Sequence, residues 1–156
     1  MVISGADNVP PLKLLSSREY RILSTVVRRI VPGSMSIPGL DLAQKIDGVL
    51  AGVRAELSRD FKLLLILFQY GSPLLGGPCK RFTHMRADEQ DSYLAGWQRS
   101  HLAFKRMGFQ VFKRVALAAF YGSEESWSYV GYRGPWLNRG YPHDYQGHGI
   151  QAPAHS

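Results

Sequence analysis

Apolar side chains recur every three to four residues along most of the chain, which is the spacing of an amphipathic helix. The first such segment covers residues 16–31. It opens with the Ser-x-x-Glu pattern of a capping box at Ser16 and Glu19, and Pro32-Gly33 ends it. Its apolar positions share one wide face and are Ile22, Leu23, Val26, Val27, Ile30 and Val31. The pattern therefore predicts a first helix with a broad core-facing surface.

A second and a third helix follow. Asp41 can cap a helix over residues 41–57, whose apolar face holds Leu42, Ile46, Val49, Leu50, Val53 and Leu57 and whose polar face holds Lys45, Asp47, Arg54 and Glu56. Residues 58–70 continue with the run LLLILF and have almost no polar side, which predicts a helix buried all round at the centre of the domain. Two prolines and three glycines then predict a loop over residues 71–78.

The second half of the sequence predicts two more helices, over residues 88–99 and 102–121. In the latter, Phe104, Met107, Val111, Val115 and Ala118 repeat at helical spacing, and Ala116, Ala118 and Ala119 are small enough for a neighbouring helix to approach closely. Ser123 is placed to cap a short helical turn through Trp127, and no periodicity remains from Gly131 onward. We expect an all-α fold, a compact bundle of about five helices over residues 1–130, and an irregular aromatic-rich tail over residues 131–156 that docks on a partner.

Composition limits the chemistry. The 156 residues are 45% apolar, which is enough for one domain with its own core, and the formal net charge is +7. The single cysteine, Cys79, excludes an internal disulfide and a paired-cysteine metal site. Its neighbours Lys80 and Arg81 could lower the pKa of the thiol, although an inert loop cysteine explains it equally.

No enzymatic motif is visible. The chain lacks the glycine-rich dinucleotide fingerprint and the phosphate-binding loop, so we expect no catalytic, cofactor-binding or metal site in it. His143, Asp144 and His148 could in principle hold a metal, but solvated or interface histidines account for them as well. The longest apolar run has six residues, which is too short for a membrane span. Arg28-Arg29 could suggest a twin-arginine export signal, but Pro32-Gly33 follows where such a signal needs a long apolar segment.

The positive charge permits a second interpretation, a basic helical module that binds nucleic acid or an anionic surface. Arg99, Lys105-Arg106 and Lys113-Arg114 would make one face of the fifth helix positive. No helix-turn-helix, zinc finger or aromatic-interleaved strand accompanies these cations, so we expect no nucleic-acid partner and keep this module as the alternative.

Aromatic residues gather between Phe120 and Tyr141, with seven rings in that stretch. Tyrosine and tryptophan supply large contact areas with a polar tip, which is typical of interfaces. Phe120, Tyr121 and Trp127 could equally complete the core of the domain. The candidate partner-binding residues are Tyr121, Trp127, Tyr129, Tyr132, Trp136, Arg139, Tyr141 and Tyr145.

Several of these residues belong to a recognisable pattern. The segments Tyr121-Gly-Ser-x-x-Ser-Trp127, Val130-Gly131-Tyr132-x-Gly134-Pro135 and Arg139-Gly140-Tyr141 resemble the C-terminal signature of the gluconate 2-dehydrogenase subunit 3 family. Leu15-Ser16-Ser17-x-Glu19 and Arg29-Ile30-Val31-Pro32-Gly33 are similar to its opening helix, and Ile46-Asp47 through Leu50 to its second. The resemblance covers about residues 14–142.

The resemblance implies a small, non-catalytic helical subunit that binds, stabilises and helps to assemble a large FAD-dependent dehydrogenase of the glucose-methanol-choline type. Such complexes oxidise sugars, sugar acids or related alcohols, and some include a cytochrome c subunit. The FAD and the catalytic base belong to the large subunit. The small subunit of the family commonly carries a twin-arginine signal, which the amino terminus here lacks. We therefore expect a cytoplasmic complex, with co-export to the periplasm by a partner that carries the signal as the alternative.

Overall fold

The computed structural model describes residues 9–74 and 80–132 of the chain, and the side chains of all of these except residues 73 and 74. Within these ranges the chain forms six α-helices and two short 3-10 helices, with no strand. The elements are α1 (Ser17–Ile30), η1 (Pro32–Ser36), α2 (Leu42–Leu50), α3 (Ala55–Leu74), η2 (Phe82–His84), α4 (Ala87–Gln98), α5 (Ala103–Tyr121) and α6 (Glu124–Trp127). The predicted all-α class is confirmed. The predicted boundary at residue 131 stays a prediction, because the description ends at Tyr132.

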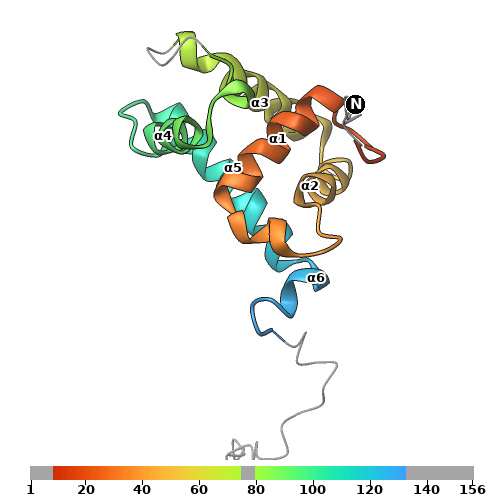
Figure 1. The fold of residues 1–156 in the computed structure, drawn as a ribbon. Coiled ribbons are helices and arrows are strands. Elements are labelled where there is room, and N and C mark those ends of the chain that lie inside the picture. Colours follow the sequence, from red (N-terminus) through yellow and green to blue (C-terminus); the bar gives the residue numbers. More distant parts are fainter. Residues whose placement is uncertain (1–8, 75–79, 133–156) are drawn as a thin grey trace, which may run out of the picture.

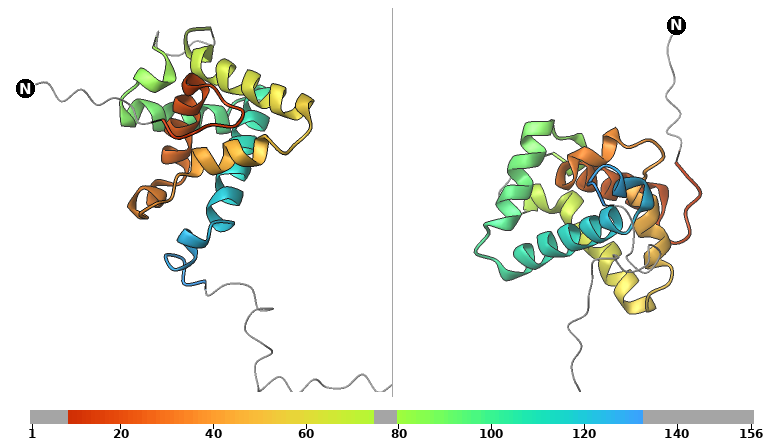
Figure 2. Two further views of the ribbon diagram at one scale, coloured as in Figure 1. Left: turned by 90° about the vertical axis from the view of Figure 1, so that its right-hand side faces the viewer. Right: turned by 90° about the horizontal axis from the view of Figure 1, so that it is seen from below.

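Figure 1 shows how the helices are arranged around α5, the long helix that runs through the molecule. Helices α3 and α4 lie at one end of α5, and the short α6 lies at the other. Helices α1 and α2 pack between these ends, and the side view in Figure 2 shows α6 projecting beyond them. The chain thus has a broad end, where α3 and α4 lie beside α5, and a narrow end formed by α6 (Figure 1).

Two of the predicted helix caps are confirmed. The Ser16 hydroxyl accepts the Glu19 N–H at 3.3 Å, and the Glu19 carboxylate accepts the Ser16 N–H at 2.8 Å, which is the reciprocal pairing of a capping box. Asp41 caps α2 by accepting the Gln44 N–H at 3.0 Å. Both helices therefore begin where a short polar side chain can satisfy the first free backbone donors.

Asp47 corrects the prediction for the second helix, which placed this residue on the polar face. Its side chain is only 1% exposed. The carboxylate accepts the backbone N–H groups of Lys13, Leu14 and Leu15, at 2.5, 3.0 and 2.7 Å. A buried carboxylate is tolerated because each oxygen has a hydrogen-bond donor. Asp47 thereby fastens the segment that leads into α1 onto α2.

The predicted helix over residues 41–57 is also wrong in its extent, because α2 ends at Leu50 and α3 begins at Ala55. A turn containing Gly52 separates the two helices, and the Ser58 hydroxyl donates to the Leu50 carbonyl at 2.8 Å. This bond satisfies a carbonyl that the end of α2 leaves free. Three residues of the predicted apolar face are exposed: Val49 within α2, and Val53 and Leu57 beyond the break.

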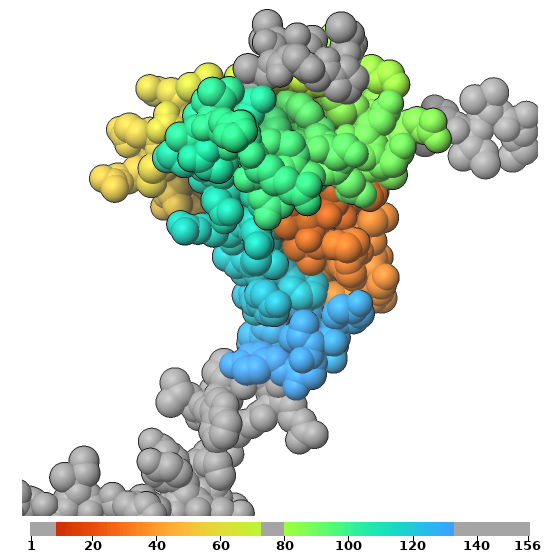
Figure 3. Space-filling model, turned by 90° about the vertical axis from the view of Figure 1, so that its left-hand side faces the viewer, coloured from red at the N-terminus to blue at the C-terminus, as the bar shows by residue number. Residues whose placement is uncertain are grey.

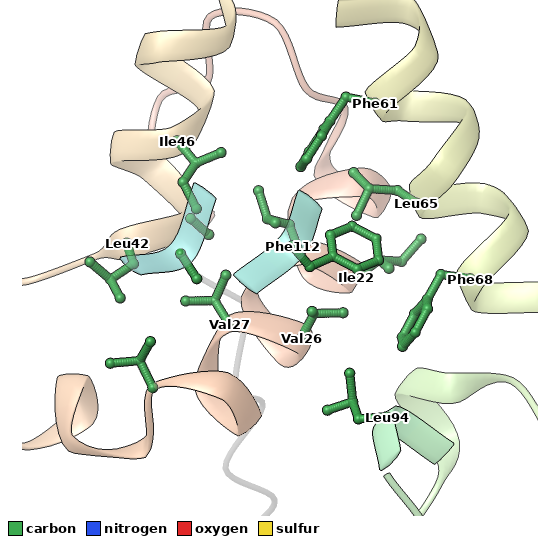
Figure 4. Packing of buried hydrophobic residues seen from close by; sticks show 14 of the residues in the cluster. Ile22, Val26, Val27, Leu42, Ile46, Phe61, Leu65, Phe68, Leu94 and Phe112 are labelled. Carbon is green, nitrogen blue, oxygen red and sulfur yellow. The ribbon is translucent and has the colours of Figure 1, made fainter. Parts of the chain in front are cut away.

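Helix α3 differs from the prediction in two ways. It continues through Leu74, so the predicted loop over residues 71–78 begins later than expected. The helix can include Pro73 because a proline near a helix end removes only one hydrogen bond and its ring already fixes φ at a helical value. Nor is the helix buried all round. Phe61, Leu65 and Phe68 point into the core (Figure 4), whereas Leu63, Ile66 and Leu67 are 60%, 37% and 39% exposed.

The centre of the core is a group of aromatic rings around Phe68, whose side chain is fully buried. Its ring centroid lies 4.6 to 5.1 Å from four others in edge-to-face arrangements, those of Phe82, Tyr93, Trp97 and Phe112. These rings come from α3, η2, α4 and α5, so Phe68 joins four elements. Figure 4 shows Phe68 and Phe112 beside the aliphatic residues of α1 and α2.

Helix α5 buries a different face from the repeat seen in the sequence. Phe109, Phe112, Ala116 and Phe120 are in the core, and the side chain of Ala116 is fully buried, consistent with the predicted close approach of a neighbour. The repeat at Phe104, Met107 and Val111 instead lies at the surface, with exposed fractions of 43%, 67% and 38%. Helix α5 is therefore apolar on two sides, and the fold covers only one of them.

Candidate protein-docking surface

The narrow end of the molecule is built by a network of side-chain hydrogen bonds where α5 gives way to α6. The Ser123 hydroxyl donates to the Ala119 carbonyl at 2.5 Å rather than capping α6, which corrects its predicted use. The Ser126 hydroxyl is within hydrogen-bond reach of the Ser123 and Phe120 carbonyls. Both hydroxyls thus bond carbonyls in the last turn of α5, in addition to the backbone bonds that close the turn. The Tyr-Gly-Ser-x-x-Ser-Trp segment is thus a polar unit that turns the chain.

Four of the predicted partner-binding residues surround this unit and are called the aromatic end here: Tyr121, Trp127, Tyr129 and Tyr132. Tyr121 is 59% exposed, Tyr129 60% and Tyr132 44%, and Trp127 is half-buried. Of the rings that could complete the core, one is buried and another is exposed. Phe120 is a core residue at 5% exposure, whereas the ring of Tyr121 is at the surface.

Trp127 and Tyr132 hold each other in place. The indole N–H of Trp127 donates to the Tyr121 carbonyl at 2.9 Å, and the Trp127 and Tyr132 ring centroids lie 5.4 Å apart, edge to face. The backbone returns through Gly131, whose φ of 70° is in the left-handed region that favours glycine, and the Tyr132 N–H donates to the Trp127 carbonyl at 2.8 Å. These rings are exposed and yet have defined positions.

The aromatic end also touches distant parts of the chain. A Cβ added to Gly33 would come within 3.0 Å of the Tyr129 hydroxyl, so this tyrosine lies close against the backbone of η1 and any larger residue at position 33 would push its ring slightly away. Lys45 on α2 forms an ion pair with Glu125 on α6 at 2.9 Å. The Pro-Gly segment that ends the first helix and the C-terminal aromatic segment, far apart in the sequence, therefore meet in the fold.

Four other predicted partner-binding residues lie outside the described ranges: Trp136, Arg139, Tyr141 and Tyr145. Cys79 and the possible metal ligands His143, Asp144 and His148 lie outside them too. In the described part of the chain, no three histidine, cysteine, aspartate or glutamate side chains come together as a metal site would require. None of the helices in residues 9–74 and 80–132 is long and apolar enough to cross a membrane.

A second apolar surface was not predicted and lies between α3 and α5. It is a shallow groove of about 560 Å³, lined by Leu63, Leu64, Ile66, Leu67, Tyr70 and Phe104. Figure 3 shows the face of the molecule on which α5 runs down toward α6. The sequence contained a signal for the groove, since the LLLILF run has more apolar positions than the inner face of one helix can hold. We call it the α3–α5 groove.

One of the cations predicted on the positive face of the fifth helix also supports the fold. The Arg106 guanidinium donates to the Ser100 and His101 carbonyls, at 2.6 and 2.9 Å, and so closes the turn before α5. Arg99, Lys113 and Arg114 remain exposed. One of the predicted cations therefore has a structural use.

Comparisons of the chain with protein-family models, with curated proteins and with solved structures found no match. The family named by the sequence motifs therefore stays a prediction. The site is described by its own geometry, a hydrogen-bonded turn that presents four aromatic side chains at one end of a helical body.

Proposed function

We propose that this chain is a non-catalytic small subunit that docks on a larger protein through its aromatic end and supports the folding and assembly of that partner. The motif resemblance suggests the partner class, a large FAD-dependent dehydrogenase that oxidises sugars or related alcohols and that holds the flavin itself. In this proposal the helical body is a rigid support, and the rings at its narrow end make the contact.

The observation that carries the proposal is the combination of exposure and order at the aromatic end. Three tyrosines are each more than 40% exposed, although hydrogen bonds and edge-to-face contacts fix the backbone and rings around them. Rings that are already in position lose little conformational entropy on binding, so burying them contributes more to affinity. Their hydroxyl groups also allow hydrogen bonds at the edge of an interface.

The α3–α5 groove supports the same reading. Two of the side chains that line it, Leu63 on α3 and Phe104 on α5, are 60% and 43% exposed. Contiguous apolar surface of this kind commonly marks a protein contact. We propose that it is the second contact area, on the face where Figure 3 shows α5.

The proposal is tested by co-expressing the full chain with a glucose-methanol-choline type dehydrogenase subunit encoded beside it. We expect the two chains to elute together in size-exclusion chromatography and the flavin absorbance to follow the complex. The triple variant Tyr121→Ser, Tyr129→Ser, Tyr132→Ser should weaken binding by at least about tenfold, because interface tyrosines are frequent hot spots.

The matched control is the pair Met35→Ser, Val49→Ser, two side chains that are 66% and 65% exposed on other elements. This variant should co-elute like the wild type. Circular dichroism of each isolated variant checks that the fold is kept. Equal loss of binding in the control, or flavin bound to the small chain alone, would contradict the proposal.

A further inference from the structure

A large, strongly basic groove runs along α1 and shares no residue with the aromatic end. It has a volume of about 720 Å³ and reaches from α1 to the end of α3 and to η2. The basic and aromatic residues of its wall are Arg18, Tyr20, Arg21, Arg28, Tyr70, Arg81 and His84, and no aspartate or glutamate is among the described residues that line it. Four guanidinium groups thus face one hollow without an acidic neighbour in its wall.

The fold uses other cations for its own ion pairs. Arg29 binds both oxygens of Asp91, at 2.7 and 2.5 Å, and Lys80 pairs with Glu89 at 3.0 Å. Among the described residues, by contrast, Arg18, Arg28 and Arg81 have no carboxylate partner. These three arginines therefore bring to the groove positive charge that no ion pair among the described residues offsets.

Two of these arginines are held in position by one ring. The guanidinium carbons of Arg18 and Arg81 lie 5.3 and 5.4 Å from the centroid of Tyr70, which is within the range of a cation–π contact. Their side chains come from α1 and from the segment just before η2, so Tyr70 brings together charges that are far apart in the sequence. The Tyr70 hydroxyl is buried and has no hydrogen-bond partner among the described residues.

One carboxylate, that of Asp41, is hydrogen-bonded to a residue of the groove wall. Asp41 accepts hydrogen bonds from the Gln44 N–H and from the hydroxyl of Tyr20, which itself lines the groove. Burial and this hydrogen bond to Asp41 raise the pKa of Tyr20 to about 12. The tyrosine therefore stays neutral and adds no negative charge to the groove.

The arginines of α1 are spread in a row along the helix rather than gathered around one point. Positions 18, 21, 25 and 28 share one face of α1, and ten residues of helix separate Arg18 from Arg28, about 15 Å at 1.5 Å per residue. A single phosphate cannot contact both ends of such a row. An extended chain spans it with about five residues at 3.3 Å each, and carboxylates along that chain can pair with successive guanidinium forks.

We propose that this arginine groove is a docking site for an acidic segment of a partner protein, a contact separate from the aromatic end. A nucleic acid fits less well, because the Tyr70 ring is already contacted by two guanidinium groups and is not offered to a base. Recognition rests on pairing of Arg18, Arg28 and Arg81 with a run of glutamate or aspartate side chains.

The test measures binding of a fluorescein-labelled octa-glutamate peptide to the full chain by fluorescence anisotropy. The triple variant Arg18→Gln, Arg28→Gln, Arg81→Gln should lower the affinity by at least about tenfold, in line with the loss of three exposed ion pairs. The matched control Arg99→Gln, Lys113→Gln, Arg114→Gln removes the same charge from other surfaces and should change the affinity less than about threefold. The variant Tyr121→Ser, Tyr129→Ser, Tyr132→Ser should bind the peptide like the wild type, which separates this contact from the proposed function.

Each other outcome overturns the proposal. Absence of peptide binding, or an equal loss in the control variant, would show that the groove is no specific site. Tighter binding of an octathymidine oligonucleotide that depends on the same arginines would assign the groove to nucleic acid. Displacement of the peptide by an equal charge concentration of inorganic phosphate would assign it to small anions. The lysine variant Arg18→Lys, Arg28→Lys, Arg81→Lys should retain part of the binding and verifies that charge, not an altered fold, is measured.

Discussion

Two groups of aromatic rings lie in different parts of the molecule and differ in burial: one is enclosed in the core, and the other is exposed. The rings around Phe68 lie 4.6 to 5.1 Å from it and are enclosed by α3, η2, α4 and α5. The aromatic end has similar edge-to-face pairs, such as Trp127 and Tyr132 at 5.4 Å, yet its tyrosines face solvent. Ring geometry is therefore alike in both groups, and what differs is the number of elements that close around them.

This difference separates stability from binding. Burial of a ring on several sides contributes to the free energy of unfolding, whereas a ring on a single projecting turn contributes mainly when a partner covers it. Changes in the core should therefore lower stability, and changes at the aromatic end should lower binding. A core substitution that left the free energy of unfolding unchanged, or an aromatic-end substitution that lowered it strongly, would contradict this distinction.

The largest effect is expected for Phe68→Ala. The side chain is fully buried and four rings would lose a neighbour, so the free energy of unfolding should fall by about 3–5 kcal/mol. Urea denaturation followed by circular dichroism measures it. The control on the same helix is Leu63→Ala, 60% exposed, which should change it by no more than about 0.5 kcal/mol. A large loss at Leu63 would mean that α3 is covered on its outer side.

The second largest effect on stability is expected at Asp47, a core residue that is polar rather than aromatic. Asp47→Asn replaces a carboxylate that accepts three N–H groups and should cost about 2–3 kcal/mol in urea denaturation. The exposed Asp60→Asn is the control and should cost almost nothing. If Asp47→Asn were equally mild, the segment before α1 would not depend on this carboxylate.

Asp47 also predicts a pH dependence. Burial by itself raises the pKa of this carboxyl, but the N–H groups of Lys13, Leu14 and Leu15 outweigh it and leave the pKa below its ordinary value. A lowered folded pKa stabilises the fold above the unfolded value of about 3.9, and this contribution disappears as the pH falls through the folded pKa. Acid titration of the free energy of unfolding should therefore show a steeper loss below about pH 4 for the wild type than for Asp47→Asn.

The smallest effect concerns the turn that supports the aromatic end. Gly131 has a φ of 70°, so Gly131→Ala should cost about 1 kcal/mol and loosen the position of Tyr132. Gly96→Ala is the control, because this glycine lies in α4 with open space around it and should gain about 0.5–1 kcal/mol. Thermal unfolding compares the two. A stabilised Gly131→Ala variant would show that the turn is not held as described.

Local signals in the sequence predicted the helices well. The capping box at Ser16 and Glu19, the Asp41 cap and the Pro-Gly stop after the first helix depend on neighbours within a few residues, and each appears in the structure. The break between α2 and α3 was missed, because the apolar spacing continues across Gly52 and Arg54. A hydrophobic repeat does not show where a helix changes direction.

The candidate site was predicted in part. Tyr121, Tyr129 and Tyr132 could be selected from the density of rings, and they are exposed as an interface requires. The LLLILF run signalled surplus apolar surface on α3, but neither the α3–α5 groove nor the arginine groove could be located, because each combines residues from separate elements. Arg18 and Arg81 show the reason, since only the ring of Tyr70 brings them to the same place.

Helical class, caps and the wealth of aromatic side chains near the end of the described chain thus follow from short-range chemistry that any reader of the residues can apply. The packing of the folded chain settled the rest: that Asp47 is buried, that Leu63 and Met107 are left outside, and that Trp127 is only half-buried while Phe68 is fully buried. Burial depends on which elements come together across long stretches of sequence, and the periodicity of a single helix carries no information about its neighbours.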